Sequence, residues 1–332
     1  MSVSTNSHSG SSRARLMRAW SFLPAVVLAI FLLVGCAPQT AVTRLTDATP
    51  TGELANVLKS GVLVIATDGD YAPQSKLNSD IPRAASSRCD LTQYTANQLA
   101  GFDIDVAAEI AHRLGVEPCF VTPTWSQIFA GNWGDRWNVN VGSMVITADR
   151  MQKLYFTQPY ISGQAVIFVH KDNQSFHTPT DLSGKRIGVC TGCAYEDYLD
   201  GTLNIPSEKI DFKIKNARVI GYDTDTSALA DLALGDGIRL EAAMTDPDTG
   251  SSAIQSGLPI KQLEGTVYHD FSAVTVDKNS VGNPIPLVKR ISSIIQELHR
   301  DGTLLKFSQK YYGGDFTTPA AKFDLQALAQ FP

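Results

Sequence analysis

Charge, cysteine and long apolar runs are all scarce in this chain of 332 residues. Charged residues make up 18% of it and sum to a net charge of −5, which argues against a nucleic-acid-binding protein, because such a protein needs a basic face. The composition has no collagen-like, coiled-coil or disordered bias. After residue 45, no stretch approaches the roughly 18 apolar residues of a membrane span. What remains is a globular chain long enough for about two domains of roughly 150 residues each.

The first 35 residues differ from the rest. They contain three arginines and no acidic residue, and the arginines are followed by an uncharged stretch that closes on Leu-Val-Gly-Cys at 33–36. A basic start, an apolar run, a small residue and then cysteine resemble a bacterial lipoprotein signal peptide. We therefore expect residues 1–35 to be removed and Cys36 to carry lipid. A plain signal peptide or a signal anchor is the alternative.

Four further cysteines remain in a chain that we expect to be exported: Cys89, Cys119, Cys190 and Cys193. An even number in an oxidising compartment suggests two disulfides. Three pairings are possible, of which Cys89–Cys119 with Cys190–Cys193 places each bridge within one half of the chain. The spacing of Cys190 and Cys193 also resembles that of a thioredoxin-type redox pair. A zinc site would need two more ligands, and the six histidines show no matching spacing, so we expect no metal.

Apolar runs that alternate with helical patterns predict an α/β fold with βαβ units. Residues 36–58 are rich in Thr, Ala and Pro and are expected to form a tether. The polar segment 75–100 reads as a long loop. The other expected elements are strands at 62–66, 118–122, 138–144, 165–169, 186–189, 217–222 and 241–245, and helices near 102–114, 125–131, 195–199, 227–234, 287–298 and 303–312.

In such sheets a ligand binds beyond the carboxyl ends of the strands, so the residues just after each strand are the candidates for a site. Arg150 is the most informative, because a cation near the start of a helix opposes the helix dipole unless an anion is bound there. A guanidinium also fits a carboxylate with two hydrogen bonds. The alternative is a surface arginine that pairs with a neighbouring aspartate. The other candidates that follow strands are Asp68, Tyr71, Trp125, Ser143, Cys193 and Asp246.

Several segments resemble the family 3 extracellular solute-binding proteins, the polar amino-acid receptors of ABC importers. They are GSMVITADR at 142–150 with FTQPY at 156–160, the strand and loop at 62–73, GFDID at 101–105, DLSGK at 181–185, and the stretch 301–313. Their order and spacing cover roughly residues 60–315. The chain departs from the family pattern at Gln74, Asn138 and Val145, and has Cys-Thr-Gly-Cys where the family has a turn rich in Thr or Ser.

The resemblance implies a periplasmic-binding-protein type II fold, in which each of two lobes is a mostly parallel sheet flanked by helices. Lobe 1 would span 59–162 and 273–332, and lobe 2 would span 163–272, with two hinge strands near 160–166 and 267–274. Arg150 would hold the ligand carboxylate and Asp246 its ammonium group. Asp68, Tyr71, Trp125 and Ser143 would contact the rest of the ligand, and Cys193 lies in the turn that would close over it.

The function implied is that of an extracytoplasmic substrate-binding component of an ABC importer, lipid-anchored at the membrane, that delivers an amino acid or similar zwitterion to a permease and its ATPase. We expect a monomer without cofactor. The excess of carboxylates at the candidate site favours polar or cationic amino acids over acidic ones. Two alternatives stay open: a ligand sensor or interaction lipoprotein, and an enzyme resembling cyclohexadienyl dehydratase. The enzyme would need a general acid with a raised pKa, and we identify no further carboxylate placed for that role.

Overall fold

The computed structural model describes residues 49–206 and 208–331. The expected signal peptide at 1–35 and the expected lipid site at Cys36 lie outside these residues. The helices are α1 (Gly52–Ser60), α2 (Phe102–Leu114), α3 (Trp125–Phe129), α4 (Arg150–Lys153), α5 (Ala194–Leu199), α6 (Asp225–Leu232), α7 (Pro247–Gln255), α8 (Ile285–Arg300), α9 (Thr303–Tyr312) and α10 (Thr318–Ala321), with short 3₁₀ turns η1 (Ala96–Gln98), η2 (Pro179–Leu182) and η3 (Leu325–Leu328).

The strands confirm the α/β prediction. In the described residues they are β1 (Val62–Ala66), β2 (Asp70–Tyr71), β3 (Ser75–Leu77), β4 (Tyr94–Thr95), β5 (Leu99–Ala100), β6 (Glu117–Val121), β7 (Val139–Val145), β8 (Leu154–His170), β9 (Arg186–Cys190), β10 (Arg218–Tyr222), β11 (Ala242–Thr245), β12 (Ile260–Gln262) and β13 (Tyr268–Asp277). The main sheet runs in the order β10-β9-β11-β8-β13-β7-β1-β6-β4. β1 pairs in parallel with β6 and β7, and β9 pairs in parallel with β10 and β11.

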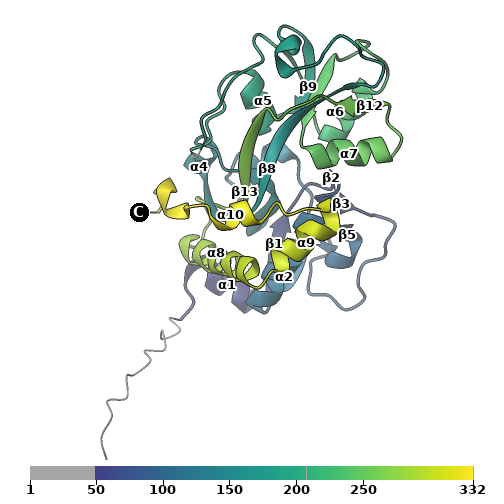
Figure 1. Cartoon of the computed structure of the whole chain (residues 1–332). Helices are drawn as coiled ribbons and strands as arrows, with labels where there is room; N and C mark the ends of the chain where they lie inside the picture. The colour runs from purple at the N-terminus through teal and green to yellow at the C-terminus, as the bar shows by residue number, and fades with distance from the viewer. Residues whose placement is uncertain (1–48, 207, 332) are drawn as a thin grey trace, which may run out of the picture. The chain divides into compact units, whose positions relative to one another are not determined.

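Two long antiparallel strands connect the two parallel parts of this sheet. β8 and β13 pair with each other from Tyr268 opposite Ala165 to Asp277 opposite Leu154. β13 then pairs with β7 on one side, and β8 pairs with β11 on the other. We call the part around β1, β6 and β7 the first half and the part around β9, β10 and β11 the second half. Figure 1 shows β8 and β13 side by side between them.

Each half has its own hydrophobic core. In the first half, α8 places Leu287, Ile291 and Leu298 against the sheet, all fully buried, as its helical spacing predicts. In the second half, Ile187 and Val189 of β9 and Met244 of β11 are buried together. Because each core lies within one half, the halves depend on β8, β13 and the contacts at the site to connect them.

Two segments are more ordered than we expected. The helix α1 lies partly within the predicted tether 36–58, because its apolar side packs Val57, which is 1% exposed, into the core of the first half. The predicted loop 75–100 contains β3, β4, η1 and β5, whose two or three residues each are too short to give a periodic pattern. The folded part therefore begins before Gly61.

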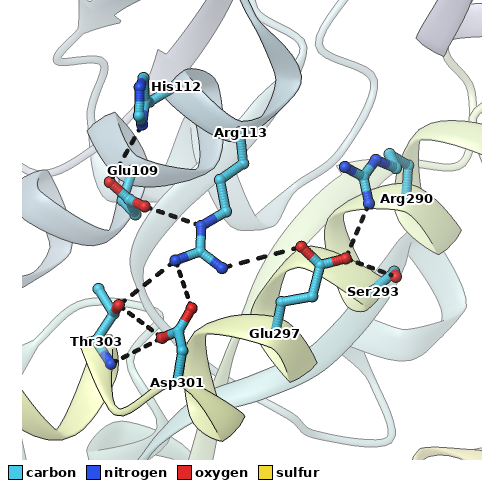
Figure 2. A network of polar contacts seen from close by, with 8 residues as sticks. All are labelled: Glu109, His112, Arg113, Arg290, Ser293, Glu297, Asp301 and Thr303. Atoms are coloured by element: carbon cyan, nitrogen blue, oxygen red, sulfur yellow. Dashed lines mark hydrogen bonds and ion pairs between the residues drawn. The ribbon is translucent and has the colours of Figure 1, made fainter. Parts of the chain in front are cut away.

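A polar network fixes α2 against α8 and the start of α9 (Figure 2). The guanidinium of Arg113 lies between three carboxylates: its Nε donates to Glu109 at 2.8 Å, Nη2 lies 2.7 Å from Asp301, and Nη1 lies 3.9 Å from Glu297. Asp301 also accepts the backbone N–H of Thr303, at 3.0 Å. Three acids on separate turns of the chain therefore share one half-buried cation.

Replacing Arg113 with methionine is expected to lower the free energy of unfolding by about 1–2 kcal/mol, because three carboxylates then repel one another without a shared cation. Urea denaturation measures the loss, which should shrink at high salt. The control is Arg290→Met, because within residues 49–206 and 208–331 Arg290 pairs with one carboxylate, that of Glu297, at 3.2 Å. Equal losses in the two variants would contradict the assigned role of Arg113.

Candidate functional site

Two adjoining cavities lie where loops from both halves of the sheet meet. The first cavity has a volume of about 470 Å³ including its open mouth, and its lining residues are Asp68, Tyr71, Trp125, Gly142, Ser143, Val145, Arg150, Cys190, Cys193, Ala194, Tyr195, Asp223 and Asp225. The second cavity has a volume of about 510 Å³ measured in the same way. Tyr71, Ser143, Val145 and Tyr195 line both cavities. The structure thus brings six of the seven predicted ligand residues to the first cavity, and Asp246 to the second.

Arg150 lies at the start of α4 and is 3% exposed. Its Nη1 donates to the carbonyl of Val145 at 3.1 Å, and its Nη2 donates to the carbonyl of Gly192 at 2.9 Å. Among the described residues no carboxylate lies within ion-pair distance of it. Burial lowers the pKa of the guanidinium. A buried cation without a carboxylate partner is costly, so this group is suited to an anion entering the first cavity.

Trp125 lies beside Arg150 and shares its acceptor. Thr124 and Gln127 form a capping box that starts α3 at Trp125. The indole ring lies 5.6 Å from the guanidinium carbon of Arg150, and its Nε1 donates to the carbonyl of Gly192 at 3.3 Å. Trp125 and Arg150 of the first half therefore donate to the same acceptor, the carbonyl of Gly192 in the turn after β9 of the second half.

The turn that carries Gly192 is closed by a disulfide between Cys190 and Cys193. The second disulfide joins Cys89 to Cys119 on β6. This is the pairing that keeps each bridge within one half, so the prediction of two disulfides is confirmed. The sulfur atoms of Cys190 and Cys193 lie within 4.8 Å of each other and of a carboxylate oxygen of Asp225. Since metal binding needs thiolates, the disulfide form leaves Asp225 as a single ligand there.

Asp246 makes two kinds of contact. It is the N-cap of α7, where its Oδ1 accepts the N–H groups of Asp248 at 2.9 Å and Thr249 at 2.8 Å. Its Oδ2 accepts the hydroxyl of Tyr71 at 2.7 Å. The capping role and a position at the site are therefore compatible, and this hydrogen bond links β2 to the N-cap of α7.

Asp68 and Ser143 line the first cavity while their polar atoms have partners within the chain. Asp68 accepts the N–H of Asp70 at 2.8 Å, and burial raises the pKa of its carboxyl. Ser143 has a positive φ of 50°, and its N–H donates to the hydroxyl of Tyr160 at 2.8 Å. Its own hydroxyl donates to Asp103 at 2.9 Å. Their predicted contacts with a ligand remain predictions.

Sequence reasoning missed the raised pKa of several carboxyls around the two cavities, three of them buried and one, Asp248, half-buried. Burial raises the pKa of Asp225 to about 8 and the pKa of Asp103, Asp248 and Asp270 to about 7 in each case. The sequence had pointed to none of these four carboxyls as a general acid. Asp225 begins the helix that follows β10, so the rule of examining residues after strands could have found it. Asp103 is part of the 101–105 motif, whose helical pattern gives no sign of its burial.

Known proteins resemble this chain over most of its length. The family model for bacterial extracellular solute-binding proteins, family 3, matches residues 88–314. The L-cystine-binding protein TcyJ of Escherichia coli (strain K12) is 26% identical over 293 residues, which are 88% of this chain and 95% of the relative. The L-cystine-binding protein TcyA of Bacillus subtilis (strain 168) is 25% identical over 303 residues, with 87% and 97% covered.

Among solved structures, a mutant of ArgBP from T. maritima has the same fold. It superposes with a TM-score of 0.63 at 23% identity, and the match covers 79% of this chain and 99% of that one. Across residues 49–206 and 208–331, no helix has the length and apolar character needed to cross a membrane. The family model spans both strands that join the halves of the sheet and most of the residues that line the two cavities, whereas Asp68, Tyr71, Gln74 and Phe316 lie outside it. This chain belongs to the bacterial extracellular solute-binding proteins, family 3.

Proposed function

We propose that this protein is the extracytoplasmic substrate-binding component of an ABC importer and that it captures an amino acid or a similar small zwitterion. One observation carries the proposal: the guanidinium of Arg150 is buried beside a cavity and is hydrogen-bonded to two carbonyls rather than to a carboxylate. A ligand carboxylate would supply the missing anion with paired hydrogen bonds. The names of the relatives, two of which bind L-cystine, agree with an amino-acid ligand.

Capture would proceed by closure of two lobes, 59–162 with 273–332 and 163–272, about the strands near 160–166 and 267–274. The helix α1 would extend the first lobe. The ligand would first meet Arg150, Trp125 and Tyr71 on one lobe, and Asp246 and the 190–193 turn would then close over it. Closure follows from the ligand's greater affinity for the closed form. The hydrogen bonds of Gly192 with Arg150 and of Tyr71 with Asp246 lie where the lobes meet.

The partners in this proposal are a permease and its ATPase, with a lipid on Cys36 holding the monomer at the outer side of the membrane. We further propose that the chain is not an enzyme, since the relatives named above are binding proteins. Because the enzyme considered above needs a general acid, the buried carboxyls make enzyme activity the point to test. Incubation with prephenate should give no turnover, and release of product at a rate above that of buffer would contradict it.

A thermal-shift screen of the full chain tests the proposal. The panel contains the twenty amino acids, L-cystine, polyamines, opines and small peptides. A ligand that binds only the folded state raises the melting temperature in proportion to the logarithm of its concentration over Kd. We expect a few amino acids to do so. No shift with any zwitterion would contradict the proposal.

Replacing Asp246 with asparagine is expected to weaken binding of the best amino acid in that screen by about tenfold or more, because a charge-assisted hydrogen bond to the ammonium group is lost. The melting temperature should stay nearly constant, because asparagine caps a helix as well as aspartate does. Titration calorimetry measures the affinity. Unchanged binding would remove Asp246 from the site.

A further inference from the structure

The second cavity has acidic side chains and no basic ones. Its lining residues are Tyr71, Gln74, Ser143, Val145, Ile161, Ser162, Gly163, Gln164, Tyr195, Asp246, Pro247, Asp248, Asp270, Ser272, Tyr312 and Phe316. Three of them are aspartates, and no lysine, arginine or histidine is among them. Asp246 already has three hydrogen-bond partners. Since the proposed function assigns Asp246 to the ammonium group of the ligand, Asp248 and Asp270 are the carboxyls of this cavity that have no assigned partner.

Asp270 is the most informative of these residues. It lies on β13 opposite Gly163 of β8 and is 5% exposed. Within residues 49–206 and 208–331, its carboxylate has no hydrogen-bond or ion-pair partner. A Cβ on Gly163 would lie only 2.5 Å from its Oδ1, so the glycine leaves the space that the carboxylate occupies. Its oxygens line the second cavity, where solvent reaches them and a cationic ligand can contact them.

Charge around Asp270 agrees with a role in binding. Burial and, to a smaller extent, the charge of Asp246 raise its pKa to about 7, against the opposing effect of the charge of Arg150. Burial and the charge of Asp246 also raise the pKa of Asp248 to about 7. A cation in the second cavity would relieve the repulsion among these carboxyls. Because the two cavities share Tyr71 and Ser143, a single small molecule could reach both Arg150 and Asp270.

We propose that Asp270, assisted by Asp248, binds a second cationic group of the ligand, so that the substrate is an amino acid with a cationic side chain. This inference rests on the proposed function, because it takes the ligand carboxylate to be held by Arg150. The second ammonium or guanidinium group lies in the second cavity. A diamino dicarboxylic acid such as cystine fits less well, because its second carboxylate meets Asp248 and Asp270 with no cation lining that cavity.

Titration calorimetry of the full chain with L-lysine and L-norleucine tests this, because norleucine differs from lysine only in lacking the side-chain ammonium group. We expect lysine to bind about tenfold or more tightly than norleucine, as a charge-assisted hydrogen bond would give. Asp270→Asn should remove most of this preference and leave the affinity for norleucine within about threefold of the original value. Asp200→Asn, at an exposed position, should change neither affinity.

Each outcome of the experiment decides the inference. Because Asp270→Asn removes a buried carboxylate, its melting temperature should not fall, so a loss of lysine binding cannot be attributed to unfolding. Equal binding of lysine and norleucine, tighter binding of L-cystine than of lysine, or an unchanged lysine preference in Asp270→Asn would overturn the inference while the proposed function stands. Failure of every amino acid in the screen to bind would overturn both.

Discussion

Replacing Arg150 with methionine is expected to weaken binding of the best amino acid of the screen by about 100-fold or more, because the ligand carboxylate would then be buried without a partner. Lysine at the same position should restore only part of the affinity, because an ammonium group cannot offer two parallel hydrogen bonds. Titration calorimetry measures both variants. The effect is large because Arg150 is 3% exposed and is the only guanidinium among the residues that line the first cavity.

The melting temperature of the unliganded variant distinguishes a loss of binding from misfolding. Arg150 is a buried cation without a carboxylate partner in the described part of the chain, so its replacement by methionine should leave the melting temperature of the unliganded protein unchanged or higher. Arg218→Met, at an exposed position, is the control and should bind normally. Retained affinity within about tenfold in Arg150→Met would remove the anion site from the account.

The unliganded protein is expected to lose stability as the pH rises from about 5 to 8. Burial raises the pKa of Asp103 to about 7 and that of Asp225 to about 8 in the folded state, whereas unfolded aspartates titrate near 3.8. Between these values the folded state binds more protons than the unfolded state. Each such group therefore lowers the free energy of unfolding by about 1.4 kcal/mol for each pH unit between its unfolded and its folded pKa. Below the unfolded pKa the group is protonated in both states, and this loss of stability is absent. Urea denaturation across this range measures the slope.

Two variants check the origin of this pH dependence. Asp225→Asn should flatten the slope between pH 5 and 8, because its carboxyl no longer titrates. Asp315 behaves in the opposite way: hydrogen bonds from Thr318 and Thr317 lower its pKa to about 2, so its contribution is lost as the pH falls below about 4. Asp315→Asn should therefore change the free energy of unfolding below about pH 4 and leave its slope between pH 5 and 8 unchanged. A stability that rises from pH 5 to 8 would contradict the burial of these carboxyls.

Much of the fold was predictable because its signals are local. The buried strand at 62–66 and the amphipathic helix near 287–298 each follow from a periodic or compositional pattern, and the structure has both. Two disulfides follow from the even number of cysteines, whereas three pairings were open and the structure has the one that keeps each bridge within one half. The place of Arg150 beside a cavity was predictable, because a cation at the start of a helix opposes the helix dipole unless an anion is bound there. The short strands could not be predicted, because β3, β4 and β5 are stabilised by pairing with distant strands and their own sequences give no periodic pattern.

The burial of the acidic residues could not be predicted. Asp270 lies in a strand whose neighbours are aromatic and polar, and its isolation comes from its pairing with Gly163, more than 100 residues earlier in the chain. Asp246 was predicted as a ligand residue, but sequence cannot show that one of its carboxylate oxygens caps α7 while the other accepts the hydroxyl of Tyr71. Both features depend on how the two halves of the sheet meet.

The most direct test of the account compares one amino acid with its own carboxamide. The wild-type chain is titrated with the tightest-binding amino acid of the screen and then with the same molecule carrying an uncharged amide in place of the carboxylate. We expect the carboxamide to bind about 100-fold more weakly, because it cannot balance the charge of Arg150, and we expect this difference to vanish in Arg150→Met. If the wild-type chain binds the two molecules with equal affinity, Arg150 holds no ligand carboxylate and the account is wrong.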